Sequence, residues 1–371
     1  MLSTKLMIAL SIIMNRPMGG PMEVAIDVTN NCTMKCITCW NYSPLNQNQP
    51  SEDWKNTYIT FEKFKELADY FGKSGVTRIM IGGDGDPFLH TQIIEILEAA
   101  KSTSAQVSVA TKGAYFSDLA LRKLINMEFD SLNISILSAS EEVFIKIHPE
   151  KNPKLFKKIV NDVKSLTRLK KEFNKQKPIV GLVFVVCKFN YHEVDKVMDL
   201  ANELRVDYVV YKRISVFTET MHLLLSQADL AVLNFKLKIV KQKSRAYGID
   251  ANVDEFNRTT IAGLSSGKYS DTLYKKIPCY VGWSYARILI NGNVIPCCGC
   301  FSKVLGNIYK DGFDEIWKSD NYAGFRTLSR RITCSNGEIS GCSCRSCIHA
   351  GSNFGIFRRF HPFKARKIFS F

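Results

Sequence analysis

Short apolar runs alternate with amphipathic segments along the first 211 residues. The segment 61–73 places its apolar residues on one helical face, whereas 178–186 is almost entirely apolar, as expected of a strand buried on both faces. The pattern predicts strands at 23–29, 77–81, 106–111, 130–136, 178–186 and 207–211. It predicts helices at 61–73, 91–100, 117–126, 153–173 and 192–204, and Ser117 is a suitable N-cap for the third.

This alternation predicts an α/β fold with parallel strands. Parallel strands joined by helices form either a barrel or a wound sheet, and in both the chemistry lies at the carboxyl ends of the strands. Three motif-like segments stand at such ends: a cysteine loop after the first strand, the glycine-rich segment 82–87 after the second, and Thr111–Gly113 after the third.

The pattern changes near Phe217. A helix is expected at 226–247, and 286–290 and 293–296 form a predicted β-hairpin around Asn291–Gly292, a strong turn signal. The tail interleaves phenylalanines with lysines and arginines. We therefore predict five parts: an N-terminal extension 1–20, a barrel 21–225, a helical connector 226–275, a small cysteine-rich α+β domain 276–350, and a basic-aromatic tail 351–371.

Composition places the chain among globular proteins. It has 371 residues, 46% hydrophobic and 23% charged, which excludes a disordered or collagen-like chain. The longest apolar stretch, Leu6–Met14, is much shorter than the ~20 residues that span a bilayer, and no secretory signal is recognisable. We expect a cytoplasmic protein. The net charge of +15 fits an anionic substrate, an anionic membrane surface, nucleic acid, or simply a lysine-rich surface.

The distribution of the 12 cysteines is more specific. Three lie within 32–39, one is Cys187, and eight lie between Cys279 and Cys347. A chain without a secretory signal seldom carries a disulfide framework, so clusters of thiols at short spacing favour metal or iron–sulfur ligation.

Cys32, Cys36 and Cys39 form a Cys-x3-Cys-x2-Cys loop directly after the first strand. Three thiolates on one loop can hold three irons of a [4Fe–4S] cluster and leave the fourth iron open, whereas zinc would want a fourth nearby Cys or His. This motif in this position resembles the radical S-adenosylmethionine (radical SAM) superfamily. The resemblance implies a partial (β/α)6 TIM-like barrel, SAM as a cofactor, and an open iron that binds SAM.

The resemblance also implies a set of SAM contacts. Family members bind SAM with a glycine-rich segment after the second strand, and Asp86 stands before Pro87 where Glu is usual. The Thr-Lys-Gly segment resembles a Thr-Asn-Gly motif, and a fourth-strand serine often lies near SAM. Thr38 occupies a position that is usually aromatic or apolar. The implied cofactor-binding residues are Gly82, Gly83, Asp84, Asp86, Thr111 and Ser135.

The C-terminal cysteines resemble a SPASM/twitch region, which carries auxiliary iron–sulfur clusters. Cys279 is followed by twelve residues, Gly292, four residues and Cys297, and Cys344-x2-Cys347 closes the region. The order of the later cysteines departs from the full SPASM pattern and favours one auxiliary [4Fe–4S] cluster. A structural zinc on the same four thiols is the alternative. Four cysteines remain as exchangeable ligands, inert thiols or a second cluster: Cys298, Cys300, Cys334 and Cys342.

The function implied by the resemblance is reductive cleavage of SAM to a 5′-deoxyadenosyl radical, which abstracts hydrogen from a substrate. We expect a small or glycosidic metabolite, including nucleotide- or lipid-linked ones, which is oxidised with help from the auxiliary cluster. A flavodoxin- or ferredoxin-type protein would supply electrons. Candidate proton acceptors are Asp84, His148 and Glu219, while Cys187 as a hydrogen-atom donor would make an epimerase.

Two other functions stay open from the sequence. A maturase or epimerase of a ribosomally made peptide would use the same chemistry, and a non-catalytic metal-binding scaffold would use none. The composition of the tail is compatible with peripheral membrane contact, nucleic-acid binding or packing on the protein itself. Of these three, we regard nucleic-acid binding as the least expected.

Overall fold

In the computed structural model, residues 4–149, 151–152, 154–259, 263–266 and 273–368 are described. Within this part of the chain, the strands form one sheet in the order β10-β9-β8-β1-β2-β3-β4-β5-β6-β7. The strands are β1 Glu23–Asp27, β2 Arg78–Gly82, β3 Gln106–Thr111, β4 Ser131–Ser135, β5 Ile179–Val186, β6 Tyr208–Arg213, β7 Asp250–Ala251, β8 Tyr285–Ile288, β9 Asn293–Ile295 and β10 Gly306–Asn307.

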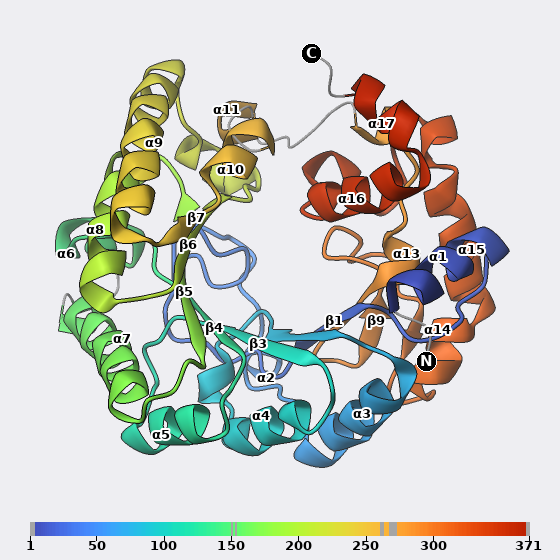
Figure 1. Cartoon of the computed structure of the whole chain (residues 1–371), viewed down its shortest axis with the longest axis horizontal. Helices are drawn as coiled ribbons and strands as arrows, with labels where there is room; N and C mark the ends of the chain where they lie inside the picture. The colour runs from blue at the N-terminus through green and yellow to red at the C-terminus, as the bar shows by residue number, and fades with distance from the viewer. Residues whose placement is uncertain (1–3, 150, 153, 260–262, 267–272, 369–371) are drawn as a thin grey trace.

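Strands β1 to β7 are all parallel to their neighbours, and helices cover their outer side as an arc (Figure 1). This confirms the α/β class and the partial TIM-like barrel. The helices of the arc are α3 Phe61–Ser74, α4 Ile93–Lys101, α5 Asp118–Asn126, α7 Lys154–Glu172, α8 Val194–Leu204 and α9 Gln227–Tyr247. Caps fix several of their starts: Ser117 accepts a hydrogen bond from the Ala120 N–H, as the sequence predicted.

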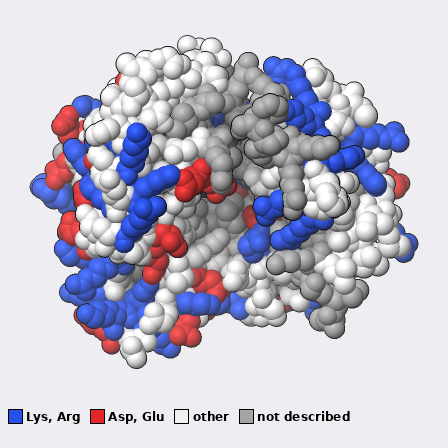
Figure 2. Space-filling model, turned by 45° about the horizontal axis from the view of Figure 1, so that its top comes forward, with Lys and Arg blue, Asp and Glu red and all other residues white. Residues whose placement is uncertain are grey.

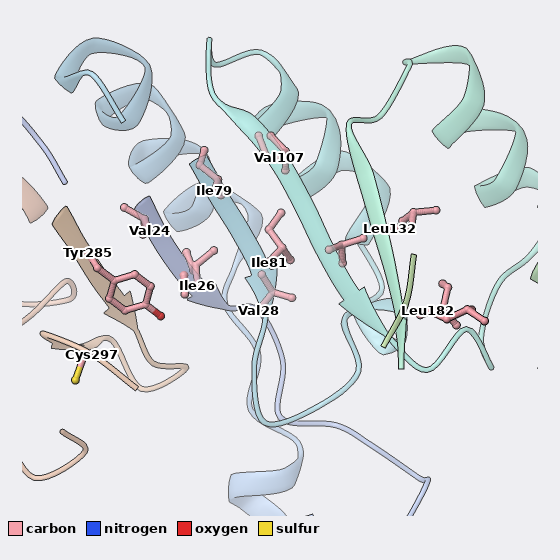
Figure 3. Packing of buried hydrophobic residues seen from close by; sticks show 14 of the residues in the cluster. Val24, Ile26, Val28, Ile79, Ile81, Val107, Leu132, Leu182, Tyr285 and Cys297 are labelled. Atoms are coloured by element: carbon pink, nitrogen blue, oxygen red, sulfur yellow. The ribbon is translucent and has the colours of Figure 1, made fainter. Parts of the chain in front are cut away.

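The barrel core lies between the strands and this arc. Val24, Ile26, Ile79 and Ile81 are fully or almost fully buried, and Figure 3 shows their side chains on β1 and β2. Because strand side chains alternate, the intervening residues face the inside of the barrel, and those of β4 and β6 are polar or only half-buried.

One glycine permits a polar pair on this inner face. Gly181 of β5 lies between Asn133 of β4 and Tyr208 of β6 in the strand register. A Cβ at Gly181 would come within 2.1 Å of the Tyr208 ring, so only glycine lets this ring cross β5. The Tyr208 hydroxyl then donates to Asn133 Oδ1 at 2.7 Å.

The C-terminal region continues the same sheet. β8 pairs in parallel with β1, and the predicted hairpin β8–β9 turns at Asn291–Gly292 with Gly292 at a φ of 82°. The remaining helices are α1 Thr4–Met14, α2 Glu52–Lys55, α6 Glu141–Ile147, α10 Val253–Thr259, α11 Gly263–Ser266, α12 Leu273–Lys276, α13 Val281–Ser284, α14 Phe313–Lys318, α15 Asp320–Arg330, α16 Ala350–Phe360 and α17 Pro362–Ile368.

Two of the predicted parts are not separate units. The connector 226–275 contains α9, which packs on α8, and β7, which pairs with β6, so it continues the barrel. Part of it, 260–262 and 267–272, lies outside the described residues. The extension 1–20 contains α1, which lies beside α13 of the C-terminal region.

The tail is anchored to the C-terminal region. Asn353 of α16 is buried, its side chain accepts from the Tyr280 N–H at 2.7 Å, and it donates to the Pro278 carbonyl at 2.9 Å. α16 ends before His361, and α17 begins at Pro362. None of the described helices is long and apolar enough to cross a bilayer.

Candidate cofactor and substrate site

The first cysteine loop follows β1. Cys36 is buried, Cys32 and Cys39 are half-buried, and the Cys39 N–H donates to the Cys36 carbonyl at 3.0 Å. Lys35 has a φ of 47°, which turns the loop sharply before Cys36. The Tyr42 N–H donates to the Cys39 sulfur at 3.3 Å, as N–H groups commonly do around ligating sulfurs.

The electrostatics of these thiols fit a cationic centre. Burial and, to a lesser extent, the neighbouring Cys36 raise the pKa of the Cys32 thiol to about 12. Burial and Cys36 also raise the pKa of Cys39. A raised pKa favours the protonated form of the Cys32 and Cys39 thiols without a metal, and iron can stabilise them as thiolates. The loop therefore has the donors that a three-cysteine iron–sulfur cluster requires.

The glycine-rich segment lies directly beneath this loop. A Cβ on Gly85 would come within 2.5 Å of the Asn30 and Asn31 backbone, so the close approach of the two segments requires glycine there. The Asp86 N–H donates to the Asn31 carbonyl at 2.8 Å. This hydrogen bond holds the start of the cysteine loop against the segment that follows β2.

Asp86 and Thr111 are brought together, but they bind each other. The Thr111 hydroxyl donates to the Asp86 carboxylate at 2.8 Å, and the backbone N–H groups of Lys112 and Phe88 donate to it at 2.7 and 3.1 Å. Asp86 is buried, and burial raises its pKa while these donors lower it. The carboxylate thus joins the ends of β2 and β3 and is already satisfied by the protein.

The other predicted SAM-contact residues lie nearer the inner space. Gly82 ends β2 opposite Asp27 of β1, and Gly83 has a φ of 129° with Asp27 within 3 Å of where its Cβ would be. Ser135 ends β4 half-buried on the inner face. Asp84 accepts a hydrogen bond from the Trp40 indole at 3.1 Å.

Asp84 belongs to a closed ring of contacts that joins both cysteine-bearing regions. Arg287 of β8 lies 3.4 Å from Asp84, and its guanidinium stands over the Phe301 ring at 5.3 Å. Phe301 meets Trp40 edge to face with ring centroids 6.2 Å apart. Sequence reasoning missed this ring, and the available signal was that Trp40 and Phe301 each directly follow a cysteine.

The second group of cysteines lines one cavity. Cys279, Cys297, Cys344 and Cys347 all line the same small pocket, which is partly open to solvent. Cys297 lies on the loop after β9 (Figure 3). Burial raises the pKa of Cys279 and Cys297, and Cys347 and Cys344 raise both further. These four thiols are near neighbours, so their donor set fits an iron–sulfur cluster by the same argument as the first loop.

The remaining cysteines of this region have other environments. Cys300 and Cys342 form a disulfide on the cavity wall, and Cys334 is exposed. Cys298 lies 2.9 Å from the Tyr285 hydroxyl. Cys300 also lies against a predicted ligand, since its sulfur is 3.4 Å from that of Cys297.

The candidate hydrogen-transfer residues lie apart from the inner space or are already engaged. Cys187 is buried in an apolar cluster with Ile37 and Leu137, which is the setting of a small packed side chain. Burial lowers the pKa of His148 to about 3, and its Nε2 is buried without a partner among the described residues. Glu219 lies half-buried in a 3-10 turn after β6.

Two protein-family models match this chain. The model of the radical SAM superfamily matches residues 26–201, and the model of the SPASM iron–sulfur cluster-binding domain matches 279–348. The tungsten-containing aldehyde ferredoxin oxidoreductase cofactor-modifying protein of Pyrococcus furiosus is 21% identical over 310 residues, which cover 82% of this chain and 83% of that protein.

Two further likenesses cover most of the chain. The PqqA peptide cyclase of Rhizobium meliloti is 22% identical over 349 residues, covering 89% of this chain and 84% of that protein. The crystal structure of Streptococcus suis SuiB bound to S-adenosylmethionine has a TM-score of 0.62 at 15% identity, covering 90% of this chain and 73% of that one. The last likeness bears on the fold.

Proposed function

Because the chain belongs to the radical SAM superfamily and carries a SPASM iron–sulfur cluster-binding domain, we propose that it removes a hydrogen atom from a polar small or glycosidic metabolite and oxidises it. The family implies [4Fe–4S] clusters and SAM as cofactors. When bound, they supply the reductive cleavage of SAM that yields a 5′-deoxyadenosyl radical. The protein supplies binding, orientation and protection from water.

We assign the SAM-binding cluster to Cys32, Cys36 and Cys39. The support is their placement on one loop at the carboxyl end of β1, where the chemistry of such barrels lies. Gly85 and Asp86 support that loop from below. Gly82, Gly83, Asp84 and Ser135 are proposed to border SAM from the ends of β2 and β4, while Asp86 and Thr111 are proposed to act by fixing the loop ends.

We assign one auxiliary cluster to Cys279, Cys297, Cys344 and Cys347. Its support is the shared cavity and the engagement of Cys300 and Cys342 with each other. The contact between Trp40 and Phe301 places the loop after Cys39 beside the loop after Cys300. A substrate held near this contact would lie between the two cysteine sites, which suits transfer of an electron from the substrate radical to the auxiliary site.

The observation that carries the substrate proposal is the polarity of the inner face. At the carboxyl ends of the strands this face carries Ser135 of β4 and Lys212 of β6, and the paired Tyr208–Asn133 and Arg78–Glu23 side chains lie deeper, toward the amino ends. Figure 2 shows that the molecule is hollowed near the middle of one face, with charged side chains of both signs around the hollow. Hydroxyls and amides of this kind pair well with a hydroxyl-rich substrate.

A ribosomally made peptide is the second candidate substrate. It is favoured by the likeness to the PqqA peptide cyclase, which extends over both cysteine regions of this chain. In that case the proteins' shared feature would be the radical step, followed by cyclisation or epimerisation of a residue of the peptide.

One experiment tests the shared chemistry and then separates the substrates. Anaerobically reconstituted enzyme with dithionite and SAM is expected to form 5′-deoxyadenosine, and replacing the three cysteines of the first loop by Ala should abolish it. A panel of deuterated nucleotide-sugars, aminoglycosides and short peptides then shows which class transfers deuterium to 5′-deoxyadenosine. If the reconstituted enzyme forms no 5′-deoxyadenosine, the proposed function is refuted. If deuterium is transferred from peptides alone, the proposal that the substrate is a small or glycosidic metabolite is refuted.

Two partners are proposed as well, an electron donor and a membrane surface. A flavodoxin- or ferredoxin-type reductant in the cytoplasm would deliver electrons. Peripheral membrane contact through the tail rests on Phe363, which is 79% exposed, near exposed Arg358, Arg359 and Lys364. Sedimentation with anionic liposomes tests this contact, and equal pelleting with and without residues 354–371 would refute it.

A further inference from the structure

Lys212 occupies a distinctive position on the inner face of the barrel. It lies next to last in β6, and its register partner on β5 is Val185. Its strand neighbours Tyr211 and Arg213 are buried on the opposite face, so the Lys212 side chain points into the barrel. This is the carboxyl end of a parallel strand, where barrel enzymes place residues that meet the substrate.

Among the described residues, no side chain pairs with the charge of Lys212. Within the described part of the chain, its ammonium forms no hydrogen bond and no ion pair, although water can reach the side chain. The other inner charges named above are paired: Arg78 with Glu23, and Arg287 with Asp27 and Asp84. A cation left alone inside a barrel is a ready partner for an anion.

The surroundings of Lys212 strengthen this point. Burial lowers the pKa of its ammonium, and nearby Cys298 opposes that effect. Val183, Val185 and Val210 surround its position with apolar side chains. The protein desolvates this ammonium only in part, because the Lys212 side chain is still exposed to solvent, so an anion that enters the barrel can reach it directly.

We propose that Lys212 binds an oxyanion group of the substrate, a phosphate or a carboxylate, and so holds the substrate in the barrel mouth. This inference rests on the proposed function, and it narrows the substrate to an anionic one. Lysine binds phosphate and carboxylate as a point charge with three donors, so it accepts either group.

Binding of simple anions to the anaerobic holoenzyme tests the proposal. Isothermal titration calorimetry would be run with pyrophosphate, as a probe for phosphate esters, and with succinate, as a probe for carboxylates. Removing one charged hydrogen-bonding partner costs enough that Lys212→Gln should weaken binding of at least one probe about tenfold or more. Lys238→Gln is the matched control, since Lys238 is exposed on α9.

Each outcome of the titrations either supports the role of Lys212 or overturns it. Stronger binding of pyrophosphate or of succinate through Lys212 supports the proposal and identifies which oxyanion the site prefers. Binding of neither probe, equal binding by the Lys212→Gln enzyme, or equal weakening by Lys238→Gln would overturn it. Iron content and thermal unfolding of both variants show that each is folded. Because no SAM cleavage is involved, failure here leaves the proposed function intact, and an inactive enzyme that binds through Lys212 leaves this proposal intact.

Discussion

Arg287 of β8 donates two hydrogen bonds to Asp27 of β1, from Nε at 3.1 Å and from Nη2 at 2.8 Å. The residues lie 260 positions apart in the chain, and both are buried. Burial raises the pKa of Asp27 to about 6, while Arg287 acts to lower it. The pair therefore joins the cysteine-rich region to the barrel by a charge interaction that depends on both members.

Replacing Arg287 by Met should destabilise the protein strongly. Without the guanidinium, Asp27 must either stay charged and unpaired beside Asp84 or take up a proton, and breaking a buried ion pair from one side costs about 3–5 kcal/mol. Urea denaturation followed by circular dichroism measures the change. The double variant Asp27→Asn, Arg287→Met should recover part of the loss, because no unpaired charge remains. If the single and double variants unfold at the same urea concentration, the pair does not hold the two regions together.

Iron analysis of single cysteine variants should separate two cluster sites. Cys36→Ala should lose about four irons per chain from the first loop, and Cys344→Ala about four from the second cavity, since each cluster needs its thiolates. Cys334→Ala is the matched control, because Cys334 is exposed in the same region as Cys344. Full iron content in Cys344→Ala, or loss in Cys334→Ala, would show that the ligands of the auxiliary site are assigned wrongly.

Gly85→Ala should disturb the first loop without removing any ligand. The added Cβ would lie about 2.5 Å from the backbone of Asn30 and Asn31, so the loop must move. We expect impaired cluster assembly and a clear loss of 5′-deoxyadenosine formation, measured together with iron content. Gly324→Ala in α15 is the control, because a Cβ there meets no atom within 4 Å and alanine favours a helix. Normal iron content and activity in Gly85→Ala would refute this role.

The sequence predicted the barrel well because its signals are local. Alternation of strand and helix, a run such as 179–186 and a cap such as Ser117 depend on nearby residues, and the cysteine spacings depend on short loops. The parallel pairing of β8 with β1 is a contact between distant segments, and no local pattern encodes it. For the same reason Arg287 was missed as the partner of Asp27 and Asp84.

Asp86 shows a different limit. Its place before Pro87 indicated a residue that faces the cofactor, yet the structure turns its carboxylate toward Thr111 and the Lys112 backbone. A motif specifies which residue is present, whereas the direction of its side chain depends on donors supplied by another strand. Lys212 carried no motif at all, and only the inward register of β6 distinguishes it from other lysines.

The buried His148 should make stability depend on pH. Its Nδ1 donates to the Phe144 carbonyl at 3.0 Å in the neutral ring, and its Nε2 has no partner among the described residues. Burial lowers its pKa from 6.5 to about 3, so between these values the unfolded chain binds a proton that the folded chain does not. The free energy of unfolding is therefore unaffected by His148 titration above pH 6.5. It falls as the pH drops toward 3, and the loss is about 2 kcal/mol at pH 5.

Urea midpoints at pH 7.5 and pH 5 measure this effect. His148→Gln should show a smaller difference between the two pH values than the native protein, whatever its absolute stability. His349, whose pKa burial lowers to about 4, remains in both proteins and contributes equally to both differences. His222→Gln, at an exposed position, should behave like the native protein. An unchanged difference in His148→Gln would mean that His148 can take up a proton in the folded state, and so that its ring reaches water or a hydrogen-bond acceptor.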